Sequence, residues 1–307
     1  MTFFKNNWLK FHYNLDPNQT HRSSHWDVFS YSSSAGNLQY ENFVQEMNNT
    51  CTDLYTTIKN KGKGAAIFLS GGVDSEIIAR TFVKLGLDFE PFFIRFADGL
   101  NLHEKHYVDI FAKQTGKKVN YIDVDLYKWC DHDLGFKNYM KTYHTWDLAT
   151  PLQIWAREQI PKSFSVISGN YEPHLFKWQL DESLKLEWAH FFEESPFMAR
   201  MKHCMDKEFN DYPFFYLYRP ELYAAYCMDP IVMKMIENPF KLSLASTKKL
   251  MMEYYFPEMP VRNKFTGFEK VQPTWRTVFD EICKDFGYID GSFAVPHSKI
   301  NTLFNYA

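Results

Sequence analysis

Residues 65–75 read Ala-Ala-Ile-Phe-Leu-Ser-Gly-Gly-Val-Asp-Ser, an apolar run that ends abruptly in small and polar residues. Apolar residues at helical spacing follow, so the stretch predicts a strand, a tight turn and the start of a helix. Small residues let backbone N–H groups approach an anion, and a helix N-terminus adds a partial positive charge. This turn therefore has the composition of a phosphate-binding loop.

The side chains of the turn suit the same purpose. The hydroxyls of Ser70 and Ser75 can donate hydrogen bonds to phosphate oxygens, and the carboxylate of Asp74 can hold a magnesium ion. The phosphate-loop pattern GxxxxGK[ST] is absent from the chain. The turn is thus either a different kind of phosphate loop or a glycine-rich turn of some other α/β protein.

Short apolar strands alternate with helical segments after this turn. We expect strands at 65–69, 92–96, 119–124 and 164–168, helices at 75–85 and 103–115, and a mostly helical stretch over 134–160. This alternation predicts an α/β fold with a parallel, doubly wound sheet. Ligands of such sheets bind at the carboxyl ends of the strands, so residues 70–75, the segment after Phe96 and Ser168-Gly169 should meet at one edge.

The rest of the chain carries weaker patterns. Residues 37–60 have helical spacing, and residues 1–36 predict an irregular lead-in held to the body by Trp8 and Trp26. Over 174–260 we expect helices without strands, packing over the active-site edge, and over 270–307 a helix at 274–285 plus a loop. The expected divisions are a lead-in and helix (1–60), an α/β core that binds the nucleotide (61–180) and a mostly helical C-terminal part that completes the site (181–307).

The composition bounds the class of protein. The 307 residues suit one large domain or two modest ones, and 45% apolar residues suffice for a sizeable core. The formal net charge is −3, so no broad basic field favours nucleic acid as a partner. The five cysteines form no metal-ligand cluster, and no apolar run approaches the roughly 18 residues that span a bilayer. These features predict a soluble cytoplasmic protein with no membrane partner.

The hexapeptide Ser70–Ser75, set between a strand and a helix, resembles the loop of the PP-loop ATP pyrophosphatases. Members of this superfamily cleave ATP between the α and β phosphates and transfer AMP to a substrate oxygen. The resemblance implies a core of the adenine nucleotide alpha hydrolase type, with ATP and Mg²⁺ bound at the loop.

Three further stretches narrow the resemblance. They are similar to a helix and the next strand of asparagine-synthase-type domains, to their Pro-led helix and SGEGxDE loop, and to their C-terminal signature K-x-L-L-R…L-P…R-x-K-x-G-F. In this chain the stretches are, in the same order, residues 102–107 with 119–125, 150–153 with 166–172, and 246–250 with 259–268. Over about residues 41–272 the chain resembles the synthetase domain of the asparagine synthetase and β-lactam synthetase family.

This resemblance implies an amide ligase. In the family the domain adenylates a small-molecule carboxylate with ATP and Mg²⁺, and ammonia or an amine then displaces AMP. Carried over to this chain, Asp74 binds the metal and Lys264 stabilises charge at the reacting centre, while we expect Arg262 to pair with a carboxylate rather than touch phosphate. The residues implied to hold the pyrophosphate or to contact the nucleotide are Ser70, Gly71, Gly72, Ser75 and Gly169.

The chain departs from the family pattern after Gly169. Asn170 stands where the family loop has its first Glu, and an amide cannot act as a general base. Either Glu172 takes the metal or base role, or another residue substitutes for it. Further candidates near the substrate end are Tyr143, His144 and Asp147.

The N-terminus differs from that of glutamine-dependent relatives. Residue 2 is Thr rather than the Cys that opens a glutaminase domain, and too few residues precede Ala65 to form one. We therefore expect free ammonia, a substrate amine or a partner protein to supply the nucleophile.

Two other interpretations stay open. One is a PP-loop enzyme that adenylates a nucleobase or a tRNA carbonyl, although the lack of a cysteine pair or cluster and the acidic balance oppose it. The other is a nucleotide-binding protein that has lost catalysis. The altered loop at Asn170 supports that view, and the intact Ser70–Ser75 loop with Lys264 opposes it.

Overall fold

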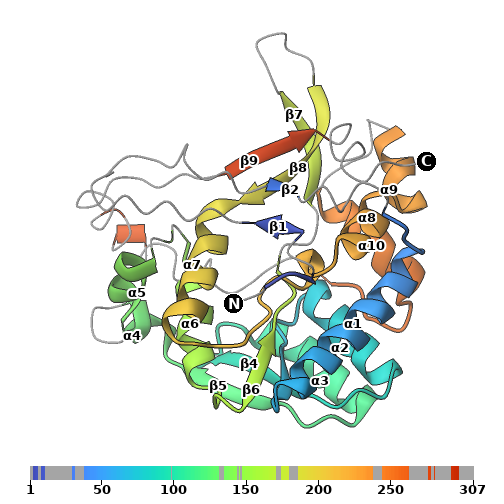
Figure 1. Ribbon diagram of the computed structural model, residues 1–307. Coiled ribbons are helices and arrows are strands. Elements are labelled where there is room, and N and C mark those ends of the chain that lie inside the picture. Colours follow the sequence, from blue (N-terminus) through green and yellow to red (C-terminus); the bar gives the residue numbers. More distant parts are fainter. Residues whose placement is uncertain are drawn as a thin grey trace.

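The structure is a computed structural model in which helices pack on a parallel β-sheet, drawn in the lower part of Figure 1. The sheet has four strands in the order β5-β4-β3-β6. The structure describes residues 3–5, 8–10, 30–31, 38–97, 99–130, 135–143, 145, 147–170, 174–179, 186–237, 244–262, 276–277, 280 and 292–296.

The strands of this sheet are short apolar runs. They are β3 (Gly64–Phe68), β4 (Glu90–Phe96), β5 (Asn120–Val124) and β6 (Phe164–Ile167). Every neighbouring pair is parallel, and Ala66 of β3 lies opposite both Glu90 and Val166. The predicted strands and their parallel arrangement are confirmed, with ends shifted by one or two residues.

Helices cover both faces of the sheet, so the predicted doubly wound arrangement is confirmed (Figure 1). Alternate residues of β3 face opposite ways: Ala65 and Ile67 join the core under the first three helices, whereas Ala66 joins the core under α6. Burying a side chain such as Ile67 stabilises the fold by about 1.5–3 kcal/mol. The helices of the two faces are α1 (Phe43–Asn60), α2 (Val73–Lys84) and α3 (Leu102–Thr115), and α4 (Leu126–Cys130), α5 (Phe136–Tyr143) and α6 (Ala149–Glu158).

The chain order creates a switch point at β3. From β3 the chain moves through α2 to β4 and through α3 to β5, and it then returns to add β6 on the other side of β3. The direction of winding therefore reverses between β3 and β6. Parallel sheets bind ligands outside the carboxyl ends of strands at such a point.

The C-terminal part adds helices to the first face of the sheet. Leu222, Tyr226, Met251 and Met252 join the same core as α1 and α2, which confirms helices within 174–260. The elements on this face are the 3₁₀ helix η4 (Phe215–Leu217), α8 (Pro220–Cys227), α9 (Pro230–Glu237) and α10 (Leu244–Tyr255). Helix α7 (Glu194–Asp206) packs instead against α5 and α6.

The expectation that residues 174–260 hold no strand is wrong. Strands β7 (His174–Gln179) and β8 (Leu186–Glu193) pair antiparallel, and β9 (Ser292–Pro296) extends them to a three-stranded sheet. Aromatic residues favour strands as much as buried helices, and β9 joins from far down the chain, so local spacing was a poor guide. Of the helix expected at 274–285, residues 276–277 and 280 are described and are helical.

The N-terminal lead-in is anchored by Trp8. This side chain is 4% exposed, and its Nε1–H donates to the carbonyl of Leu217 at 2.9 Å, so the expected anchor is confirmed. The lead-in also contains two short strands that the sequence did not predict, β1 (Leu9–Lys10) and β2 (Ser30–Tyr31), which pair antiparallel with each other. Trp26 lies outside the described residues. The division at residues 60 and 180 stays a prediction. In the part of the chain that the structure describes, no helix has the length and apolar character to cross a membrane.

Candidate active site

The loop between β3 and α2 has a backbone that requires glycine at position 71. Gly71 has a φ of +73°, in the left-handed region. A Cβ there would lie 2.5 Å from the carbonyl oxygen and 2.8 Å from the Cα of Glu104 in α3. Gly72 then precedes α2 in an extended conformation, with φ −81° and ψ 165°. The loop therefore turns sharply and passes against α3 before the helix begins.

The two serine hydroxyls of the loop meet each other. The Oγ atoms of Ser70 and Ser75 lie 3.1 Å apart. The N–H of Ser70 donates to Ser75 Oγ at 3.1 Å, and the N–H of Gly72 donates to Ser70 Oγ at 3.2 Å. Ser75 is buried whereas Ser70 is exposed, so the hydroxyl pair closes the turn and leaves Ser70 where a phosphate oxygen can reach it.

Helix α2 brings its positive end to this loop. The first N–H groups of an α-helix have no acceptor within the helix and carry a partial positive charge. Asp74 lies in this first turn and is partly buried, and its backbone oxygen accepts from the Tyr216 hydroxyl at 3.4 Å. The helix end can thus hold an anion while the Asp74 carboxylate stands close by to hold a cation.

The end of β6 closes against the same helix end. A Cβ at Gly169 would lie 2.8 Å from the N of Ser75 and 2.9 Å from the carbonyl carbon of Asp74. The segment after Phe96 turns at Asn101, which accepts from the N–H of Phe96 at 3.0 Å, and leads into α3, whose Glu104 lies against Gly71. Three segments that the sequence predicted to meet at one edge therefore do so.

Asn170 has a structural hydrogen bond. Its Nδ2–H donates to Ser168 Oγ at 3.0 Å, and that hydroxyl donates to the carbonyl of Pro213 at 3.2 Å. Glu172, the predicted base or metal ligand, lies outside the described residues, so its role stays a prediction.

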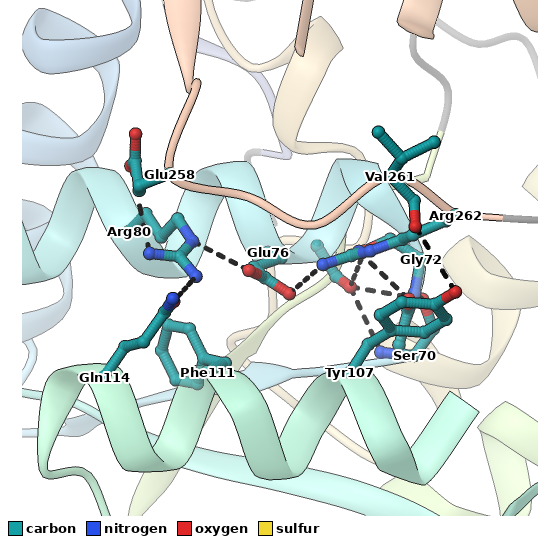
Figure 2. A network of polar contacts seen from close by, with 12 residues as sticks. Ser70, Gly72, Glu76, Arg80, Tyr107, Phe111, Gln114, Glu258, Val261 and Arg262 are labelled. Carbon is teal, nitrogen blue, oxygen red and sulfur yellow. Dashed lines mark hydrogen bonds and ion pairs between the residues drawn. The ribbon is translucent and has the colours of Figure 1, made fainter. Parts of the chain in front are cut away.

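Arg262 joins the C-terminal segment to the loop, as Figure 2 shows. Its Nη1–H donates to the carbonyl of Gly71 at 2.9 Å, and its Nη2 forms an ion pair with Glu76 of α2. The guanidinium lies 4.8 Å from the centre of the Tyr107 ring. The expectation that Arg262 pairs with a carboxylate is confirmed. Lys264 lies outside the described residues, and its role stays a prediction.

Sequence reasoning missed Glu76, Arg80 and their neighbours. Arg80 Nε–H donates to Glu76 at 2.7 Å, its Nη2–H donates to Gln114 at 2.5 Å, and its guanidinium lies 5.7 Å from the Phe111 ring centre. The spacing of four residues between Glu76 and Arg80 on a predicted helix was a usable signal for their pairing.

Two of the further candidates have contacts around α6. The ring of Tyr143 meets the ring of His203 edge-on at 5.4 Å, and burial raises the pKa of Tyr143 to about 12. Asp147 accepts from the N–H of Thr150 at 2.6 Å, at the start of α6. These contacts are structural. His144 lies outside the described residues.

The first turn of α2 offers the carboxylate of Asp74 for a metal. Within the described ranges, no three His, Cys, Asp or Glu side chains gather into a group that could hold a metal ion. Mg²⁺ in nucleotide sites is usually held by one or two carboxylates together with substrate phosphates. A single carboxylate beside a phosphate loop therefore fits Mg²⁺ that arrives with a nucleotide.

Similarity to known proteins is low. No protein-family model and no curated protein matches the chain. An NH3-dependent NAD synthetase from Campylobacter jejuni is 14% identical over 80% of this chain and 93% of its own, with a TM-score of 0.34. An NMN synthetase from Francisella tularensis is 12% identical over 81% of this chain and 96% of its own, with a TM-score of 0.27. At these TM-scores neither likeness carries a conclusion about activity, so the function is inferred from the loop and its surroundings.

Proposed function

We propose that this chain is an ATP-dependent carbon–nitrogen ligase that releases AMP and pyrophosphate. The observation that carries the proposal is the Ser70–Ser75 loop. There a left-handed Gly71, two paired hydroxyls and the start of α2 meet at the carboxyl ends of β3 and β6. The sequence resemblance to asparagine synthetase and β-lactam synthetase supplies the reaction that such a loop would serve.

The proposed reaction has two steps. First, a carboxylate oxygen of the substrate attacks the α-phosphorus of ATP, and the bond to the bridging oxygen of the β-phosphate breaks. Second, the nitrogen of ammonia or an amine attacks the acyl carbon, AMP leaves and the nitrogen loses a proton. The proposal includes a small-molecule carboxylate, ammonia from solution or from a partner protein, and a cytoplasmic location.

The loop residues have proposed parts in the first step. The hydroxyls of Ser70 and Ser75 and the backbone around Gly71 and Gly72 hold the pyrophosphate, and the end of α2 offsets its growing charge. Gly169 leaves room for the backbone against the helix end. The chemistry that Mg²⁺ supplies when bound at Asp74 is neutralisation of phosphate charge.

Two further residues complete the proposed site. Lys264 stabilises negative charge at the reacting centre, and Glu172 holds the metal or takes the proton from the attacking nitrogen. Both assignments come from the sequence resemblance.

A pyrophosphate-release screen tests the proposal. The full chain is incubated with ATP, Mg²⁺ and a panel of carboxylates, each with ammonia or an amine, and aspartate with ammonia is one pair. We expect at least one pair to yield pyrophosphate and AMP in equal amounts. Release of ADP and phosphate, or no turnover with any pair, would contradict the proposal.

Two variants make the screen specific. Asp74→Asn should abolish pyrophosphate release, because it removes the charge proposed to hold the metal. Asp88→Asn is the matched control, since Asp88 is 83% exposed beyond the far end of α2 and pairs with Lys117. It should leave turnover unchanged.

A further inference from the structure

Three buried charged side chains, Arg80, Glu76 and Arg262, form a row beside the loop (Figure 2). They are 7%, 3% and 6% exposed. Each oxygen of the Glu76 carboxylate receives one of the two arginines. Two guanidinium groups therefore share one carboxylate, and the buried row holds one net positive charge. At its outer end Glu258, 50% exposed, lies 3.8 Å from Arg80.

Stability alone is a poor account of this row. Taking ions out of water is unfavourable, and apolar residues of similar volume often stabilise a fold equally well. The row is also incompletely bonded, because the buried Nε of Arg262 has no hydrogen-bond partner among the residues described. Buried N–H groups are usually satisfied, so this unpaired donor calls for an explanation.

What Arg262 holds is the loop. Its bond at 2.9 Å goes to the carbonyl of Gly71, the residue whose φ of +73° makes the sharp turn. The direction of that carbonyl depends on the turn at Gly71, so the hydrogen bond from Arg262 depends on the conformation of the loop. Tyr107 of α3 holds the same end of the C-terminal segment, with its ring against Arg262 and its hydroxyl 3.5 Å from the carbonyl of Val261.

We propose that Arg262, held by Glu76, is a positioning residue that joins the phosphate loop to the segment that carries Lys264. Lys264 follows Arg262 by two residues, so chain geometry keeps its Cα within about 7 Å of the Cα of Arg262. One guanidinium then fixes both the loop turn and the described end of the C-terminal segment, two residues before Lys264 in the sequence. The part that concerns Lys264 rests on the proposed function, whereas the link between loop and segment does not.

Hydrogen exchange measures this link without turnover. Arg262→Ala should speed exchange by about tenfold in peptides covering 69–76 and 257–268 together, since both lose a shared charged hydrogen bond. Peptides of α1 should be unchanged.

Arg95→Ala is the matched control for this measurement. Arg95 also pairs with a carboxylate, Asp123, and lies 4.7 Å from a tyrosine ring centre, Tyr121, but it is 40% exposed and its partners lie on β5. It should leave both peptides as in the wild type.

Two further variants separate positioning from general stability. Lysine carries a single ammonium nitrogen and cannot reproduce the two directed bonds of the planar guanidinium, so Arg262→Lys should behave like Arg262→Ala despite its charge. Guanidinium ion at a low, non-denaturing concentration should restore protection to both peptides of Arg262→Ala and leave Arg95→Ala unaffected. If Arg262→Ala fails to fold, Arg262→Lys and Glu76→Gln give the same comparison.

The outcomes are distinct. Faster exchange in one peptide only, or an equal rise throughout α1, would overturn the link. If hydrogen exchange shows the link but no substrate pair releases pyrophosphate, Arg262 keeps its positioning role and the proposed function is rejected. With a working substrate, Arg262→Lys should lower kcat about tenfold while KM for ATP changes less.

Discussion

Two buried arginine–carboxylate pairs differ in where their remaining bonds go. Arg157 and Asp211 are 5% and 4% exposed, and Arg262 and Glu76 are 6% and 3% exposed. Arg157 uses all its nitrogens, since Nε donates to Asp211 at 2.5 Å and the other two donate to the carbonyls of Ile160 and Phe164. The Nε of Arg262 has no hydrogen-bond partner among the described residues, and its Nη1–H donates to the carbonyl of Gly71 in the loop.

We call Arg157 and Asp211 the scaffold pair, and Arg262 and Glu76 the site pair. The second oxygen of Asp211 accepts from the N–H of Val166 at 2.9 Å, so the Arg157 pair fixes the start of β6 to α6. Every described partner of that pair belongs to the scaffold. The Arg262 pair connects a helix, a loop and a distant segment. Substitution of the first pair should therefore act on global stability, and substitution of the second on the loop.

The largest expected effect comes from Asp211→Ala. It leaves the Arg157 charge buried without a counter-charge, which should lower the free energy of unfolding by about 3–5 kcal/mol. Urea denaturation of the purified protein measures this loss.

The control removes both charges of that pair. Arg157→Met combined with Asp211→Leu leaves no buried ion and should regain most of the stability lost by Asp211→Ala. If the double variant is as unstable as the single one, the unpaired charge is not the cause.

The loop side of the comparison is tested by Gly71→Ala. Both Gly71 and Gly62 have left-handed backbones, with φ of +73° and +67°, but only a Cβ at position 71 meets other atoms, those of Glu104. We expect Gly62→Ala to cost about 1 kcal/mol and Gly71→Ala about 2 kcal/mol or more, because the clash adds to the backbone strain. Gly71→Ala alone should also weaken binding of pyrophosphate with Mg²⁺ in calorimetry. Equal effects of both variants on stability and on binding would refute the structural requirement at Gly71.

A pH-dependent effect, confined to pH values below about 6.5, belongs to His203, near the scaffold pair. Its Nε2 lies 3.1 Å from Glu158, and burial lowers the pKa of His203 to about 4. The unfolded chain takes up this proton near its ordinary pKa of about 6.5, so stability should fall as the pH drops from about 6.5 towards 4, by up to about 1.4 kcal/mol for each pH unit.

The variant His203→Gln removes this titration and keeps a group that can donate to Glu158. Between pH 7 and pH 5 its Tm should change less than that of the wild type. The pKa of Glu158 is lowered, so that carboxylate titrates below this range and does not mimic the effect. Identical pH profiles of the two proteins would reject the assignment to His203.

The fold at the loop was predictable because its signals are local. The strand, turn and helix around Ser70–Ser75 lie within one short stretch, and each neighbouring strand has its own apolar run. The left-handed turn at Gly71 follows from glycine chemistry. The close approach of Glu104 does not, because it depends on how α3 packs.

Long-range pairing was beyond sequence reasoning. The sequence predicted a carboxylate partner for Arg262 but could not name Glu76, which is 186 residues away, nor foresee the bond to the Gly71 carbonyl. The same limit explains β7 and β8, whose sheet is completed by β9 from the end of the chain. That an amide such as Asn170 cannot act as a base follows from its chemistry alone and needs no structure.

The smallest expected effect comes from Arg95→Ala. This variant tests whether burial, rather than the chemistry of the two groups, determines how much an ion pair contributes to stability. Arg95 bonds to Asp123 with two nitrogens, at 2.5 and 2.7 Å, beside a tyrosine ring, much as Arg262 sits between Glu76 and Tyr107. The hydrogen bond from Arg95 lowers the pKa of Asp123, so its contribution is complete above about pH 4 and is lost as the pH falls further. Because both side chains are exposed, Arg95→Ala should lower the stability in urea denaturation only slightly, and less in 1 M salt. A loss of stability as large as that of Asp211→Ala would mean that bond geometry alone determines the contribution of an ion pair. The distinction between scaffold, site and surface pairs would then be wrong.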